Sequence, residues 1–128
     1  MYRLTPVKRL IPVFFAASVL FSDAAFAQAI SFNRDVRPIL ADRCFLCHGP
    51  NAKDRKAKLR LDRADGPEGA YRTHKGSSAI KPGSLKDSAL WYRITTTDAD
   101  ERMPPAEAHK KPLSKNEQAI IKSWIESG

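Results

Sequence analysis

The chain contains two cysteines, and both belong to one short motif that ends in a histidine, Cys44-Phe45-Leu46-Cys47-His48. On a helical turn, positions i, i+3 and i+4 lie on one face, so both sulfurs and the imidazole point the same way. This is the C-x-x-C-H pattern that attaches c-type haem. We predict thioether bonds from Cys44 and Cys47 to the two haem vinyl groups, with His48 as the proximal iron ligand.

Three other uses of the cysteine pair are open. A disulfide between residues three apart is tight, and it leaves His48 without a role. A thioredoxin-like redox pair belongs in a βαβ context, which this sequence does not predict. A zinc site needs four ligands, and the other two histidines, His74 and His109, have no partner at ligand spacing. Haem attachment is the interpretation that uses every residue of the motif.

Met103 is the only methionine after the initiator, and it lies in a proline-rich loop. Pro104 biases the residue before it away from helical geometry, which places Met103 on an extended segment. Its thioether is a soft ligand suited to haem iron, and His/Met ligation raises the reduction potential. We predict Met103 as the distal iron ligand. The alternatives are a core gap-filler and ligation by His74 or His109, which both stand among polar neighbours.

The segment 1–27 has the order of a secretory signal peptide. A basic start precedes the short apolar run 10–21, and Ala25-Phe26-Ala27 offers small residues before the cleavage point. The run is shorter than the roughly 20 residues of a membrane-spanning helix. We predict a periplasmic or otherwise exported domain of residues 28–128 with no membrane span after cleavage; an uncleaved tether is the alternative. Cleavage lowers the formal charge from +8 to +6, since it removes three bases and one acid.

Hydrophobic periodicity predicts three helices after residue 27. The first is capped by Asp35 and runs through the C-x-x-C-H motif to Gly49-Pro50-Asn51, which ends it. The second lies within Ser84–Thr95, and the third opens with a capping box, Ser114-x-x-Glu117. The apolar residues expected to pack in the core and against the cofactor are Val36, Leu40, Leu59, Leu61, Leu90, Ile94, Ile121 and Trp124.

Two long loops, residues 51–83 and 96–112, separate these helices. Neither contains a convincing strand, and loops of this length are unusual in a compact domain unless they are functional. We therefore predict an all-α fold of about three helices and long loops packed around a covalently attached haem. Without that haem we expect a largely unfolded chain.

Six basic residues fall between positions 53 and 63, interrupted by two aspartates. They are Lys53, Arg55, Lys56, Lys58, Arg60 and Arg63. This basic stretch has three interpretations: a docking patch for an acidic redox partner, arginines that cover the haem propionates, or a solvated loop. A nucleic-acid partner is not expected of an exported chain without interleaved aromatic residues.

The order of these motifs resembles the planctomycete-type cytochrome c domain, a class I-like c-type cytochrome. The segments that carry the resemblance are Ile30–Leu40, Cys44–Pro50, Arg55–Ala57, Leu59–Asp62, Ala79–Gly83, Ser88–Leu90, Arg93–Thr95, Asp100–Pro105 and Ile121–Ile125. The resemblance implies a small all-α cytochrome c-like fold, with covalent haem at Cys44 and Cys47 and with His48 and Met103 as axial ligands. Such domains usually open a longer exported protein, whereas this sequence ends at Gly128.

These observations predict one-electron transfer through one His/Met-ligated haem c per chain. We expect a monomer that exchanges electrons with redox proteins, acidic ones being the candidates, and no catalytic residue. The alternatives are a haem-based sensor or peroxidase-like module, an N-terminal haem domain of a larger exported protein, and a binding module in which haem is only structural.

Overall fold

The computed structural model describes residues 29–128, so the signal peptide predicted for residues 1–27 lies outside the described residues. The elements in chain order are the π-helical turn η1 (Phe32–Val36), α1 (Arg37–Arg43), α2 (Phe45–His48), β1 (Thr73–His74), β2 (Ser77–Ser78), α3 (Ala89–Thr95), the 3-10 turn η2 (Ala106–Ala108) and α4 (Lys115–Ser127). Within residues 29–128, no helix is long and apolar enough to cross a membrane.

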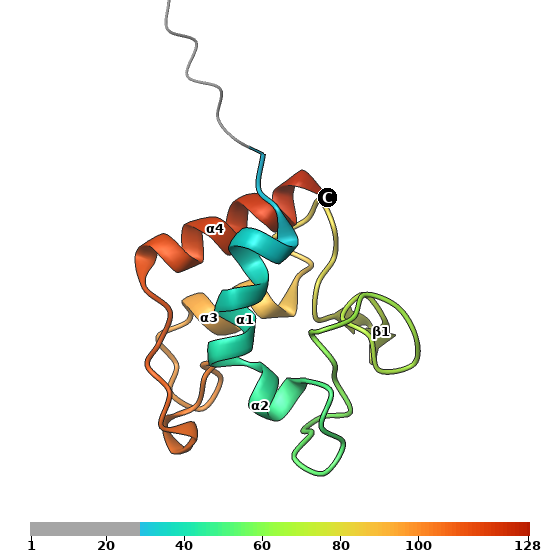
Figure 1. The fold of residues 1–128 in the computed structure, drawn as a ribbon, viewed down its shortest axis with the longest axis vertical. Coiled ribbons are helices and arrows are strands. Elements are labelled where there is room, and N and C mark those ends of the chain that lie inside the picture. The colour runs from blue at the N-terminus through green and yellow to red at the C-terminus, as the bar shows by residue number, and fades with distance from the viewer. Residues whose placement is uncertain (1–28) are drawn as a thin grey trace, which may run out of the picture.

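The helices meet in one small apolar core. α1 continues from η1 toward α2, while α4 packs against both η1 and α3 (Figure 1). Val36, Leu40 and Ile121 are almost fully buried where these helices meet. At the edge of the core the Phe32 and Trp124 rings pack at a tilt, with centroids 5.4 Å apart. Burial of these apolar side chains is the main favourable contribution to the fold.

Most of the apolar residues predicted for the core are buried. Leu59 and Trp124 are partly buried and pack against the core, whereas the other six are inside it. The capping box of α4 is confirmed: the Ser114 hydroxyl accepts from the Glu117 N–H at 3.2 Å, and the Glu117 carboxylate accepts from the Ser114 N–H at 2.7 Å.

The first predicted helix is divided in two. Helical structure already begins at Phe32, and Asp35 lies inside the first turn, where its carboxylate accepts from the Ser31 N–H at 2.8 Å. At Cys44 the backbone leaves helical geometry, with φ −125°, which separates α1 from α2. The second predicted helix is shorter than expected, since α3 begins only after Ser88.

The expectation of an all-α fold with about three helices is wrong. The described residues form four α-helices and a two-stranded antiparallel sheet, a mixed α/β structure. Thr73 pairs with Ser78, and both residues of the intervening turn, Lys75 and Gly76, have positive φ. Such a turn matches the twist of the strands it joins. Strands of two polar residues have no alternating apolar pattern, so periodicity could not reveal them.

Candidate haem-binding site

The C-x-x-C-H motif spans the junction between α1 and α2. The Cys44 carbonyl accepts from the His48 N–H at 2.8 Å, which closes a helical turn around the motif. Both thiols are free; Cys44 is buried and Cys47 is half-buried. Burial raises the pKa of the Cys44 thiol to about 12 and lowers the pKa of His48. The imidazole is therefore neutral at pH 7, the form that ligates metals.

Backbone groups of the following loop hold the end of α2. The Lys56 N–H donates to the Cys47 carbonyl at 2.7 Å. The Leu61 N–H donates to the His48 carbonyl at 2.8 Å. Carbonyls at a helix C-terminus have no partner within the helix, so these contacts satisfy groups that would otherwise be orphaned. They also tie the loop to Cys47 and His48, two of the three motif residues that would touch haem.

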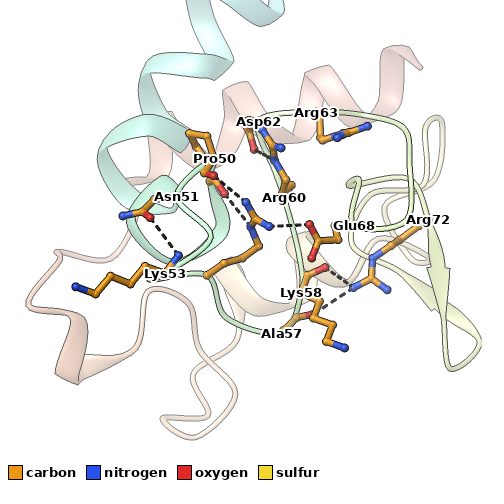
Figure 2. A network of polar contacts seen from close by, with 12 residues as sticks. Pro50, Asn51, Lys53, Ala57, Lys58, Arg60, Asp62, Arg63, Glu68 and Arg72 are labelled. Atoms are coloured by element: carbon orange, nitrogen blue, oxygen red, sulfur yellow. Dashed lines mark hydrogen bonds and ion pairs between the residues drawn. The ribbon is translucent and has the colours of Figure 1, made fainter.

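Arg55 extends this arrangement past the motif. Its Nε donates to the Gly49 carbonyl at 3.1 Å, and its Nη2 donates to the Pro50 carbonyl at 2.8 Å. The same guanidinium pairs with Glu68 at 2.7 Å (Figure 2). Only 11% of the Arg55 side chain is exposed. One buried guanidinium thus clamps the segment that follows His48.

The other arginines of the basic stretch also bind within the loop. The Arg60 Nε donates to Asp62 at 3.0 Å (Figure 2). The Arg63 Nε donates to the Asp65 carbonyl at 2.8 Å. The three lysines of the stretch are exposed. The arginines therefore bind groups of the loop itself, whereas the lysines and the exposed Arg63 present positive charge to solvent.

Two adjoining cavities contain the predicted ligands. Cys44, His48, Ala57 and Met103 line both of them. The smaller, about 230 Å³, is completed by Leu59, Leu61, Ala79, Ala89, Leu90 and Arg93. The larger, about 620 Å³, is completed by Arg43, Leu46, Cys47, Lys56, Pro104, Pro105, Glu107, Ala108 and His109. None of Arg55, Arg60 and Arg63 lines either cavity, so the interpretation that they cover propionates has no support here.

The folded chain brings Met103 to the cavity walls that His48 also lines. Met103 lies in non-helical structure, and its N–H donates to the Arg93 carbonyl at 2.8 Å. Of the rival ligands, His74 is exposed on β1 and lines neither cavity. His109 is exposed but lines the larger cavity. Met103 is thus better placed than either histidine.

Arg93 is a member of this site that the sequence interpretation did not single out. It lies on α3, whose apolar residues Ala89 and Leu90 line the same smaller cavity. Its spacing from those residues on a helix was the available signal, because i and i+3 or i+4 share one face. Its charge gave no such signal, since basic residues are spread along the whole chain.

The donor set fits a covalently bound haem. Two free thiols, a thioether and an imidazole line cavities whose walls are mostly apolar, and the His48 Nδ1 is buried without a hydrogen-bond partner. Zinc fits poorly, because nowhere in residues 29–128 do three His, Cys, Asp or Glu side chains gather into a possible metal site. Nor do the described elements include the βαβ unit of a thioredoxin-like pair. The residues that line the site are those of a c-type haem protein.

Comparison with known proteins gives the family. The family model of Planctomycete cytochrome C matches residues 44–107, half of the chain, and the chain belongs to this family. It is therefore a c-type cytochrome domain that binds haem. Hydrazine synthase subunit alpha of Kuenenia stuttgartiensis is 25% identical over 123 residues, an alignment that covers 79% of this chain and 15% of that protein. No solved structure gives a significant match.

Proposed function

We propose that this chain transfers single electrons through one haem c, bound at Cys44 and Cys47 and ligated by His48 and Met103. The observation that carries the proposal is that Met103, remote from the motif in sequence, lines both cavities that His48 lines. When bound, haem iron supplies the change between the ferrous and ferric states.

The chain itself contributes attachment, ligands and a dry surrounding. Two sulfurs and two axial side chains would hold the cofactor at four points. The apolar walls at Leu59, Leu61 and Leu90 exclude water, and a neutral thioether ligand favours the reduced state. Because the end of α2 is fastened by Arg55 and by loop amides, His48 stays in place when the charge on the iron changes.

The proposed partners are redox proteins with an acidic surface, and the proposed location is the periplasm, after removal of residues 1–27. Lys53, Lys56 and Lys58 are exposed, and Lys56 lines the larger cavity, so positive charge borders the proposed cofactor. Charge of one sign around a cleft attracts partners of the opposite sign. We propose that the protein is a monomer. We also propose that it has no catalytic residue, since protein side chains would occupy both axial positions of the iron.

A second candidate is a haem module that serves a larger enzyme. The similarity to hydrazine synthase subunit alpha favours it, because that protein is named as part of an enzyme and this chain spans only 15% of its length. A module of this kind would either relay electrons or expose an iron coordination site. Carbon monoxide binding to the reduced protein separates the two functions, since a six-coordinate electron carrier resists it.

The first test is haem content. The full chain, expressed with haem-maturation machinery, should give a pyridine haemochrome spectrum typical of two thioether bonds, with one haem per chain. Cys44→Ala and Cys47→Ala should each shift the spectrum toward a single thioether bond. Protein without haem would end the proposal.

The second test is ligation. Met103→Ala should remove the methionine–iron band from the ferric spectrum and lower the reduction potential, because a soft neutral ligand is lost. His74→Ala and His109→Ala are matched controls that should leave both readouts unchanged. An unchanged ferric spectrum in Met103→Ala would exclude methionine ligation, and a change in His109→Ala would identify the ligand instead.

A further inference from the structure

Arg93 carries the one permanent positive charge in the wall of the smaller cavity. The rest of that wall is apolar apart from Cys44, His48 and Met103. The Arg93 side chain is 39% exposed, so the guanidinium lies at the boundary between the cavity and solvent. A charge at such a boundary acts more strongly than one in open water, because the effective dielectric constant is lower.

Arg93 also holds the Met103 loop at two points. Its carbonyl accepts from the Met103 N–H at 2.8 Å. Its Nη1 donates to the Glu101 carbonyl at 3.0 Å and pairs with the Glu101 carboxylate at 2.9 Å. The backbone and the side chain of one helical residue thus fasten both ends of the segment 101–103.

The other cations near the cavities are differently placed. Arg43 lines only the larger cavity, and its guanidinium pairs with Glu117 at 3.0 Å and donates to the Lys111 carbonyl at 2.7 Å. Lys56 is exposed and lines only the larger cavity.

We propose that Arg93 is a positioning residue of the haem site, which fastens the Met103 loop and supplies the positive charge for a haem carboxylate. The inference rests on the proposed function. Because ferric haem carries one more positive charge than ferrous haem, a nearby guanidinium favours the reduced state. One residue would then control both methionine ligation and the reduction potential.

The test compares Arg93→Gln with Arg63→Gln in the haem-loaded full chain. Both variants remove one positive charge, but Arg63 is exposed and lines neither cavity. Arg93→Gln should lower the equilibrium constant for haem reduction about tenfold, which is about 59 mV for a one-electron couple. Arg63→Gln should change it less than about twofold, as expected for a screened surface charge. Equal potentials in the two variants would overturn the proposal.

Two further variants separate charge from fastening. Arg93→Lys keeps the charge but replaces the planar guanidinium with a compact ammonium, which alters the contacts to the Glu101 carbonyl and carboxylate. Its potential should therefore lie between those of wild type and Arg93→Gln. Glu101→Gln leaves Arg93 without its counter-charge and should raise the potential. If Glu101→Gln and Arg93→Gln both lower the potential and weaken the methionine–iron band, Arg93 only fastens the loop and its proposed charge role is wrong.

Different results would contradict the role of Arg93 and the proposed His/Met ligation. If Met103→Ala leaves the ferric spectrum unchanged, methionine ligation itself is excluded, whatever the Arg93 variants show. If Met103→Ala removes the band but Arg93→Gln matches Arg63→Gln, the function stands and only the role of Arg93 falls. Should Arg93→Gln fail to fold, Arg93→Lys and Glu101→Gln still decide the question.

Discussion

At the residue scale, the tightest backbone approach near the site is at Gly49. A Cβ at this position would lie 2.2 Å from the Phe45 carbonyl oxygen and 2.9 Å from the Phe45 Cβ. Such contacts cannot be relieved by a side-chain rotation, because one partner is backbone. Gly49 therefore lets the chain turn immediately after His48, before Arg55 clamps the following carbonyls.

We expect Gly49→Ala to cost more than about 2 kcal/mol in the free energy of unfolding and to reduce haem attachment. Gly76→Ala is the control: its added Cβ meets nothing within 4 Å, although φ is +83°. Its cost should be about 1–2 kcal/mol from backbone strain alone, with normal haem content. Denaturant unfolding and haem content measure both effects. Normal haem content in Gly49→Ala would show that the turn tolerates a side chain.

Arg55→Gln should loosen the segment after His48. The change removes donors to two carbonyls and the partner of Glu68, a loss of about 1–3 kcal/mol. Amide hydrogen exchange should accelerate most at Lys56 and Leu61, whose N–H groups bind the end of α2.

Arg72→Gln is a matched control for this prediction. Arg72 also donates to two carbonyls, those of Ala57 and Lys58, at 3.1 and 2.9 Å (Figure 2). It makes no contact with the motif, so the exchange rates of Lys56 and Leu61 should change less. Equal acceleration in both variants would mean that the loop opens as one unit and that Arg55 has no special link to His48.

At the element scale, α4 is the helix whose start is set most completely by its own residues. Its capping box also meets another element, because Glu117 pairs with Arg43 of α1 at 3.0 Å. The pKa of Glu117 lies below its ordinary value, mainly because its carboxylate accepts a hydrogen bond from the Ser114 N–H. The Glu117 carboxylate therefore stabilises the fold at pH values above that ordinary value, and the stabilisation is lost as the pH falls through the lowered pKa.

Ser114→Ala should cost about 1 kcal/mol, the usual value of an N-cap. Glu117→Gln should flatten the dependence of stability on pH below the ordinary pKa of a glutamate side chain, since the group that titrates there is removed. Denaturant unfolding of both variants at several pH values measures this. A wild-type slope in Glu117→Gln would show that other carboxylates cause the acid sensitivity.

At the scale of the whole molecule, the core and the smaller cavity share some of the same apolar residues. Leu61 and Leu90 are buried in the core and also line the smaller cavity. A chain this short buries a modest share of its surface, and unfilled apolar cavities destabilise a fold. We expect Cys44→Ala/Cys47→Ala to lose most helical circular dichroism. A cooperatively folded protein without haem would contradict this expectation.

The charge distribution makes a separate prediction about electron exchange. Lys56→Glu should slow oxidation by hexacyanoferrate(III), an anion, several-fold at low salt, because Lys56 lines the larger cavity. Lys115→Glu makes the same change of charge at an exposed position of α4 that lines neither cavity, so it should have a smaller effect. The difference should vanish near 1 M salt, where the Debye length is about 3 Å. Equal rates for the two variants at low salt would exclude this docking face.

Features that depend on neighbouring residues could be read from the chain alone. The C-x-x-C-H chemistry follows from positions on one helical turn, and the capping box of α4 from residues three apart. The apolar stripe of α4 likewise indicated Ile121 correctly. The hairpin at residues 73–78 was not predicted because its strands have no alternating apolar pattern. The break at Cys44 was not predicted because nothing in the local sequence marks it.

The amino-acid order was thus sufficient for the cofactor class, since attachment requires only a local spacing of two sulfurs and an imidazole. The amino-acid order alone could not show which groups the charged side chains contact. Arg55 turns inward because carbonyls after α2 need donors, whereas Arg93 reaches the cavity because α3 packs beside it. Those positions depend on contacts between segments far apart in the chain, and a contact of that kind exists only once the chain has folded.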